Sequence, residues 1–242
     1  MAVQTIWSLF KRPSPSSSFQ ILSDLHLEIN QQYSFEIPVC SKYLILAGDI
    51  GRLEDYNNYR LEKAKQLENE PCMNGRLVLL HQRRYDIPDT RITILGCTLW
   101  SQIPQESTDI VHYKISDFQK IKEWSVEQHN KAHGSDLSWL RGEIQALRES
   151  QEKRSILVVT HHAPSLQGTS SPQHAKNLWN CAFGTDLLSL PWEGVKIWVF
   201  GHTHYTTEFK ERGIRVVSNQ RGYVLPWKTE KGNFDVRRVV WV

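Results

Sequence analysis

The chain has 242 residues, of which 40% are hydrophobic and 23% charged, so it can build a sizeable core and is not disordered throughout. No apolar run approaches the about 18–20 residues that a membrane span needs, which argues against a membrane protein. The net charge is +3 and the basic pairs are short and scattered, so there is no clear nucleic-acid signature. The four cysteines form no CxxC pair, which favours reduced thiols and a cytoplasmic location over a secreted disulfide framework.

A cluster of Pro and Ser at 13–18 predicts a flexible leader over residues 1–18, followed by a single domain over residues 19–242. Within that domain, short apolar runs alternate with polar stretches and turn residues. Strands are predicted at residues 19–22, 43–47, 77–80, 92–95, 155–160, 196–200, 214–218 and 236–241.

Two helices are expected between these strands. The first covers residues 55–70 and is ended by Pro71, whereas residues 105–134 are helical or irregular. Ser135 or Asp136 can cap the second helix. The apolar positions at helical spacing are Leu61, Ala64 and Leu67 in the first helix, and Leu140, Ile144 and Leu147 in the second. Alternating strands and helices, with strands dominating late, predict an α/β fold in which helices cover sheets.

Four of the predicted strands end in residues that can bind a metal ion. They are Asp24 and His26 after the first strand, Asp49 after the second, His161 and His162 after residues 155–160, and His202 and His204 after residues 196–200. We expect these side chains to meet, because ligand sites gather past the carboxyl ends of strands. A spacing of two in an extended segment would put both members of an Asp-x-His or His-x-His pair on one face. Gly48 and Gly201 would let the backbone approach a neighbour closely.

Carboxylates mixed with imidazoles suit Zn²⁺, Mn²⁺ or Fe. A carboxylate can bridge two ions, and ions about 3.5–4 Å apart can clamp both the attacking and the leaving oxygen of a phosphoryl displacement. Each piece alone also has a structural interpretation: SDLH as a helix cap, Gly48-Asp49 as a turn, and His161-His162 as a loop. Four such pieces together in this order favour a metal site.

The stretches ILSDLHLE, LILAGDIG, VVTHHAPS and VFGHTHYT resemble the motifs of the calcineurin-like metallophosphoesterase superfamily, and the resemblance runs from about residue 19 to residue 242. It implies a four-layer α/β/β/α sandwich, in which two mixed sheets are flanked by helices, and a binuclear metal centre. One ion would take Asp24, His26, Asp49 and His204, and Asp49 would bridge to a second ion held by His161 and His202. His161 fits the family pattern better than His162. The segment 219–223 (NQRGY) resembles one that lines the site in relatives, although a polar strand end and turn explains it equally well.

One motif of the family is missing. Relatives carry Gly-Asn-His and an acid after the Gly-Asp strand, a helix and another strand; the Asn ligates the second ion and the His assists leaving-group protonation. This chain has no Gly-Asn-His, so we expect a helix–strand unit to be absent after Asp49, near residues 55–59. His81 follows an apolar run at a suitable spacing and is a candidate substitute, but a surface or core histidine is the simpler interpretation. The second ion would be one ligand short, and an absent central strand would expose apolar edges.

The leading hypothesis is a metal-dependent phosphoesterase that hydrolyses phosphomono- or phosphodiesters. Hydroxide held by two divalent ions would attack phosphorus in line. All six matching residues would hold metal, and the catalytic roles would fall on Asp49, His161 and His202. The alternatives are a catalytically impaired or inactive relative, such as a one-metal binding protein or a truncated isoform, and a hydrolase of non-phosphate esters. The sequence does not reveal the class of phosphoester.

Overall fold

The computed structural model describes residues 17–51, 59–225 and 232–242. All but the last two residues of the predicted leader (residues 1–18) lie outside these ranges, as does nearly all of the region where the missing motif was expected. The strands are β1 (Ser18–Leu22), β2 (Tyr43–Leu46), β3 (Arg83–Asp86), β4 (Ile92–Cys97), β5 (Ser155–Thr160), β6 (Val195–Phe200), β7 (Glu208–Glu211), β8 (Ile214–Ser218) and β9 (Val239–Trp241). The α-helices are α1 (Tyr59–Glu68), α2 (Thr108–Lys114), α3 (Asp117–Lys120) and α4 (Val126–Glu149). Short 3₁₀ helices cover Ile29–Gln31, Pro71–Met73, Gln105–Ser107 and Asn180–Ala182.

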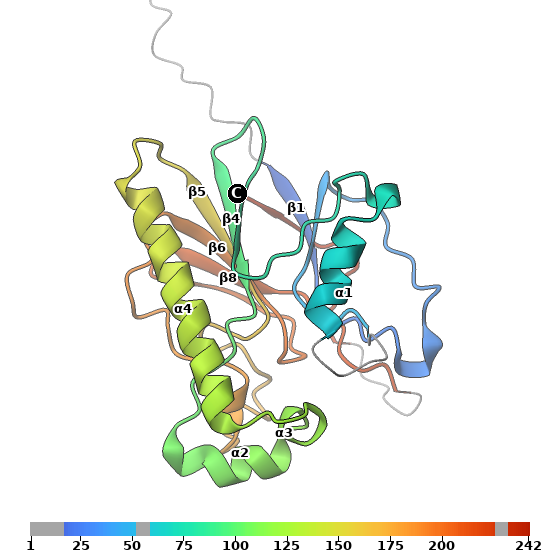
Figure 1. Ribbon diagram of the computed structural model, residues 1–242, viewed down its shortest axis with the longest axis vertical. Helices are drawn as coiled ribbons and strands as arrows, with labels where there is room; N and C mark the ends of the chain where they lie inside the picture. The colour runs from blue at the N-terminus through green and yellow to red at the C-terminus, as the bar shows by residue number, and fades with distance from the viewer. Residues whose placement is uncertain (1–16, 52–58, 226–231) are drawn as a thin grey trace, which may run out of the picture.

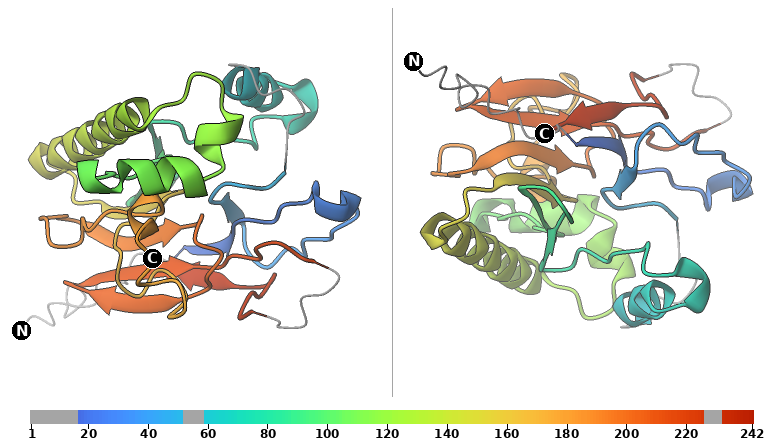
Figure 2. Two further views of the ribbon diagram at one scale, coloured as in Figure 1. Left: turned by 90° about the horizontal axis from the view of Figure 1, so that it is seen from below. Right: turned by 90° about the horizontal axis from the view of Figure 1, so that it is seen from above.

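These strands form two mixed sheets. The small sheet has the order β2-β1-β9, and the large sheet has the order β3-β4-β5-β6-β8-β7. In the large sheet β4, β5, β6 and β8 run parallel, and β3 and β7 are antiparallel edges. Figure 1 shows α4 against the large sheet and α1 on the opposite side of the molecule, and the views of Figure 2 show the same layers from below and above. The predicted two-sheet α/β fold is therefore confirmed.

Alternation along the strands divides the apolar residues between two cores. In β1, Phe19 and Ile21 face the space between the sheets, where they pack with Ile45 of β2 and with Leu157 and Val199 of the large sheet. The other face of the large sheet packs on α4 through a second core. That core includes Leu95, Val158, Trp198 and Val216 from strands, and Leu140, Ile144 and Leu147 from α4. Each long strand of the large sheet is thus buried on both faces, as parallel strands usually are.

Helix α4 begins earlier than predicted. The Ser125 side chain caps it by accepting a hydrogen bond from the Gln128 amide. The side-chain oxygen of Gln128 in turn accepts a hydrogen bond from the Ser125 amide. Ser135 and Asp136, predicted as caps, lie inside the helix, so that prediction is wrong. The predicted inner face is correct, but it continues toward the amino terminus with the buried polar residues His129, His133 and Asp136.

Two strand predictions also need correction. Residues 77–80 form no strand; Leu80 instead packs on Gly96 of β4, where a Cβ would lie 2.5 Å from Leu80 Cβ. The edge strand that pairs with β4 is β3. Strands β3 and β7 were not predicted from the sequence because both are exposed or half-buried and lack an apolar run. Among the helices that the structure describes, none is long and apolar enough to cross a bilayer. All four cysteines are free, and Cys40 and Cys72 are exposed.

The two sheets meet at the carboxyl ends of β1 and β8. The Ser23 amide donates to the carbonyl of Asn219, and the Gly222 amide donates to the carbonyl of Asp24. The buried Asn219 side chain donates to the carbonyls of Ile21 and Asp235. This junction brings the loops after β1, β2, β5, β6 and β8 to one end of the molecule.

Candidate metal centre

Six side chains predicted as metal ligands come together at this junction, in two groups of three. Cluster 1 consists of Asp24, His26 and His204, and cluster 2 consists of Asp49, His161 and His202. Within each cluster, one potential ligand atom from each residue lies within 4.8 Å of the others. The loops after β1, β2, β5 and β6 supply these residues, as expected for parallel strands that end at one edge.

Cluster 1 is organised around a buried carboxylate. Asp24 is fully buried, and its two oxygens accept the His202 amide at 3.0 and 3.1 Å. The Ser23 hydroxyl also donates to it. The Nε2 atoms of His26 and His204 lie 3.0 Å apart, and His204 Nε2 lies 3.5 Å from Asp24 Oδ1. The donor atoms therefore converge, while backbone and hydroxyl groups hold the carboxylate from behind.

Asp49 lies between the two clusters. Its Oδ2 is 3.5 Å from His161 Nε2 in cluster 2 and 3.9 Å from His26 Nε2 in cluster 1. His161 Nδ1 donates to the Ala47 carbonyl at 2.9 Å, which aims its Nε2 at Asp49. A single carboxylate within reach of histidines from both groups is the arrangement that a bridging ligand requires.

The backbone at this site is left-handed at most ligand positions. The φ angles are +51° at Asp24, +45° at His26, +47° at Asp49, +72° at His202 and +51° at His204. The segments are therefore not extended, and the expected geometry of two side chains on one face of a strand is wrong. Asp24 and His26 do share cluster 1, but His202 and His204 diverge into different clusters.

Both predicted close approaches exist. A Cβ on Gly48 would lie 2.2 Å from His161 Nδ1, and a Cβ on Gly201 would lie 2.2 Å from Ser23 Oγ and 2.7 Å from Asp24 Oδ2. Such contacts are far shorter than van der Waals distance. Each glycine is thus the residue that lets a ligand side chain reach its position against the neighbouring backbone.

Charge in the site is unevenly distributed. Burial raises the pKa of Asp24 to about 6, although the charge of His161 works against this rise. Burial would lower the pKa of His161, but the Asp49 carboxylate outweighs it and raises the pKa above its usual range. Burial and the nearby His161 hold the pKa of His202 well below its usual value. His161 and Asp49 thus form an ion pair, and a cation bound there would displace the proton of His161.

The donor set fits divalent metal ions. Imidazole with carboxylate suits Zn²⁺, Mn²⁺ and Fe. Two ligands about 2.1 Å from one ion at tetrahedral or right angles lie about 3.0–3.4 Å apart, close to the spacing of His26 and His204. His202 Nε2 is buried and has no hydrogen-bond partner among the described residues, which fits a nitrogen reserved for an ion.

The two histidines considered as substitute ligands lie elsewhere. His81 is exposed and lies near Asp136 of α4, outside both clusters. His162 is buried behind cluster 2, where its ring stacks on His202 with centroids 4.1 Å apart. His161, rather than His162, is therefore the histidine of this pair that joins a cluster.

The segment 219–223 combines both roles that its sequence allowed. Asn219 and Gln220 are buried parts of the sheet junction. Arg221 donates to the Leu25 carbonyl and to Gln32 and thereby fixes the loop after β1. Tyr223 places its ring 4.3 Å from the His26 ring and 4.6 Å from the His204 ring, measured between centroids, so it lines cluster 1.

Sequence reasoning missed the residues that support the ligands. Glu28 Oε1 lies 3.5 Å from His26 Nδ1, where a carboxylate can orient the imidazole. It belongs to the quoted SDLHLE stretch, two residues after His26, so the motif held a signal. Trp100, His129 and His162 lie behind cluster 2. The sequence offered His162 only as a possible ligand, and nothing in the local sequence of Trp100 or His129 marks them as its neighbours.

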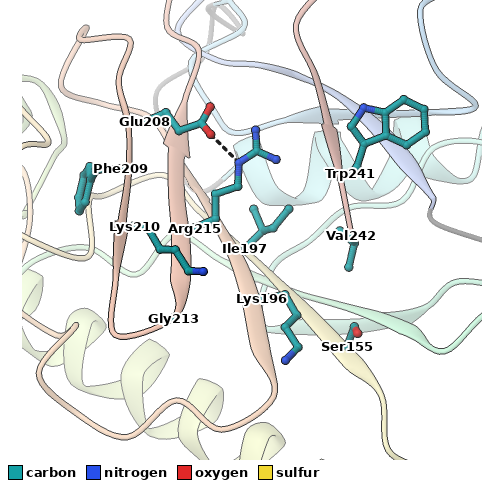
Figure 3. Close-up of a pocket in the computed structure, with 10 residues that line it drawn as sticks. All are labelled: Ser155, Lys196, Ile197, Glu208, Phe209, Lys210, Gly213, Arg215, Trp241 and Val242. Atoms are coloured by element: carbon teal, nitrogen blue, oxygen red, sulfur yellow. Dashed lines mark hydrogen bonds and ion pairs between the residues drawn. The ribbon is translucent and has the colours of Figure 1, made fainter. Parts of the chain in front are cut away.

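A separate hollow lies away from both clusters. Figure 3 shows it between β6, β7, β8 and the chain end after β9, with Lys196, Lys210, Arg215 and Trp241 among the lining residues. Arg215 is paired with Glu208 there. The three cationic side chains point in different directions in this view, so they do not converge on one point.

The fold and the clusters define a class: an α/β protein of two mixed sheets with paired groups of possible metal ligands at strand ends. The chain superposes on the crystal structure of phosphopantetheinyl hydrolase (PptH) from Mycobacterium tuberculosis with a TM-score of 0.62, covering 87% of this chain and 91% of that one at 15% identity. A structure described as a "putative 5'-nucleotidase" from Staphylococcus aureus matches with a TM-score of 0.28, over 56% of this chain and 23% of that one at 15% identity.

Among curated proteins, the chain is similar to uncharacterized protein L509 of Acanthamoeba polyphaga mimivirus. The two are 27% identical over 256 residues, which is 97% of this chain and 87% of the viral protein. That alignment is longer than the present chain, so the viral protein carries additional residues within the aligned region. No family model matches the chain.

Proposed function

We propose that the chain is a metal-dependent phosphoesterase that hydrolyses phosphomono- or phosphodiesters at clusters 1 and 2. The observation that carries the proposal is the convergence of six possible ligands, from four strand ends, with Asp49 between the two groups. PptH is a phosphopantetheinyl hydrolase and shares the fold, which is compatible with this chemistry.

Each residue then has a defined part. Two divalent ions would supply positive charge that neutralises phosphate oxygens and makes bound water acidic. Asp24, His26 and His204 would hold one ion, His161 and His202 the other, and Asp49 would bridge them. The buried carboxylate of Asp24 is kept in place by the His202 amide, which couples the positions of the two clusters. Tyr223 lines the side of cluster 1 and would limit where substrate can lie.

The test is an assay with p-nitrophenyl phosphate and bis-p-nitrophenyl phosphate after loading with Mn²⁺. We expect hydrolysis by the wild type and at least a 100-fold loss in His204→Ala, because that change removes a cluster 1 ligand. The matched control is His81→Ala, which removes an exposed histidine outside both clusters and is expected to keep wild-type rates. If the wild type and His204→Ala are equally slow, the enzyme proposal fails for this chain.

A second candidate is a relative that binds metal but does not turn over. The observations that favour it are the missing Gly-Asn-His motif and the position of β2, which is an edge of the small sheet within the described residues. Elemental analysis of the purified protein separates the candidates. We expect close to two metal ions per chain for the enzyme, and one or none for the impaired form.

A further inference from the structure

The turn that follows β4 is unusual because two successive residues without glycine's freedom adopt left-handed backbone. Leu99 has φ +70° and Trp100 has φ +47°. A bulky residue rarely takes this conformation, and it persists only where its surroundings hold it. Neither residue belongs to a metal cluster.

Helix α4 holds this turn with its buried polar face. The Leu99 amide donates to Asp136 Oδ2 at 2.7 Å, and His133 Nδ1 donates to the Leu99 carbonyl at 2.9 Å. One helical turn earlier, His129 Nε2 lies 3.0 Å from Ser101 Oγ. All three α4 residues are at most 3% exposed. A rigid helix therefore fixes the backbone on both sides of Trp100.

From this turn, a column of rings leads to cluster 2. The Trp100 ring lies 5.3 Å from the His162 ring, and the His162 ring stacks on His202 at 4.1 Å with an interplanar angle of 29°. The backbone links the same elements, because the amides of His161 and His162 both donate to the carbonyl of Thr98. Phe183 lies on the His202 ring at 4.9 Å.

The His202 ring depends on these neighbours for its orientation. The His162 and Phe183 rings both lie against it, whereas the His161 ring is fixed by a hydrogen bond from its Nδ1 to the Ala47 carbonyl. We propose that Trp100 and His162 are positioning residues of cluster 2, which hold the His202 imidazole beside Asp49 and His161. This inference rests on the proposed metal binding at cluster 2, and its test uses metal affinity rather than phosphoesterase activity.

The experiment is a calorimetric titration of the metal-free protein with Mn²⁺ alone. His204→Ala and His202→Ala assign the binding steps to clusters 1 and 2. Trp100→Leu and His162→Leu remove a ring while keeping apolar bulk, and we expect each to weaken the cluster 2 step about 10–100-fold and to leave the cluster 1 step within about threefold. Trp100→Phe and His162→Phe keep a ring at each place and are expected to restore most of the cluster 2 affinity.

The control for general loss of packing is Trp192→Leu. Trp192 is a buried tryptophan against Trp198, before the amino end of β6 and therefore away from the metal clusters. It is expected to lower the melting temperature without changing either binding step. The proposal is overturned if both Leu variants at the column bind Mn²⁺ as the wild type does, or if Trp192→Leu weakens cluster 2 equally.

A second readout keeps the test decisive if the wild type binds only one ion. The imidazole signals of His202, assigned by their loss in His202→Gln, report its environment in the metal-free protein by NMR. We expect shifted and broadened signals in Trp100→Leu and His162→Leu, with recovery in the Phe variants. Unchanged His202 signals in the Leu variants would contradict the positioning role of Trp100 and His162. This result does not depend on whether cluster 2 binds a metal ion.

Discussion

At the scale of single residues, most of the site has backbone dihedral angles that are unfavourable for residues other than glycine. Five of the six candidate ligands have positive φ, and none of the five is glycine or asparagine. Each such residue costs of order 1–3 kcal/mol in free energy of folding. The compensation is local: the Asp24 amide donates to Gly48, the His26 amide to Asp49, and the His202 amide to the Asp24 carboxylate. Hydrogen bonds among these residues and their neighbours thus stabilise the unfavourable backbone conformations.

Gly201 leaves no room for an added carbon next to Ser23, Asp24 and Ala47. In Gly201→Ala, the new Cβ would lie 2.2 Å from Ser23 Oγ and 2.8 Å from the Ala47 carbonyl oxygen, so Asp24 and its neighbours must move. We expect a loss of about 1–3 kcal/mol in the free energy of unfolding. We also expect the cluster 1 affinity for Mn²⁺ to fall at least tenfold, as measured by denaturant unfolding and by titration.

The matched control is Gly142→Ala, in the exposed face of α4, where a Cβ meets nothing within 4 Å. Alanine is a better helix former, so we expect a gain of about 0.5–1 kcal/mol and unchanged metal binding. If Gly201→Ala binds Mn²⁺ with wild-type affinity, the tight contact at Gly201 does not serve the ligand position.

The sequence identified the candidate metal-binding residues but not their geometry. The residue pattern places Asp24, His26, Asp49, His161, His202 and His204 at strand ends, and the structure brings all six together. It could not reveal the left-handed backbone, because even aspartate and histidine, which are enriched in that region, adopt it at only a minority of positions and nothing in the local sequence marks these ones. It could not reveal Trp100 behind His162 either, since only the fold makes them neighbours.

At the scale of elements, α4 carries two different faces. Leu140, Ile144 and Leu147 pack against the large sheet, while His129, His133 and Asp136 hold the turn after β4. Burial lowers the pKa of His129 to about 4, and the adjacent His133 adds to this effect. The titratable groups facing His129 are His133 on the same helix and His162 from the loop after β5.

His129 therefore makes the free energy of unfolding decrease as the pH falls. Its ordinary pKa is 6.5, so below that pH the unfolded chain binds a proton that the folded chain excludes. As pH falls from 7 to 4, this group alone removes up to about 3 kcal/mol of folding free energy. We expect the free energy of unfolding, measured with urea, to decline over this range, and His129→Gln to flatten the decline.

The control is His112→Gln, because His112 of α2 is exposed. Its pH profile is expected to follow the wild type. A decline of the same steepness in His129→Gln and the wild type would show that other groups cause the acid sensitivity.

The elements that were predicted well share one property. β5 and β6 are continuous apolar runs buried on both faces, and their predicted bounds agree with the structure to within one residue. β3 and β7 were missed because their sequences, RRYD and EFKE, carry charges that suit exposed edge strands. The start of α4 was misplaced because its first turns bury histidines rather than aliphatic residues.

At the scale of the whole molecule, the two sheets have unequal protection. The large sheet is covered by α4 on one face and by the small sheet on the other. In the small sheet, Leu44 and Leu46 of β2 are 45% and 40% exposed, and Trp241 of β9 is 59% exposed. β2 is also the sheet's edge among the described residues. An edge strand with exposed leucines is a template for pairing with another chain.

Adjacent residues of β2 allow this view to be tested. Leu44 points outward, whereas Ile45 is 5% exposed and packs between the sheets. Leu44→Lys is expected to change the free energy of unfolding by less than about 0.5 kcal/mol, because its side chain is already half in water. It should also reduce concentration-dependent light scattering, because an outward lysine opposes edge pairing. Ile45→Lys buries an unpaired ammonium and is expected to abolish folding or to cost at least about 3 kcal/mol. If Leu44→Lys is as damaging as Ile45→Lys, the outer face of the small sheet is covered in solution, and the edge is part of a contact that the protein needs.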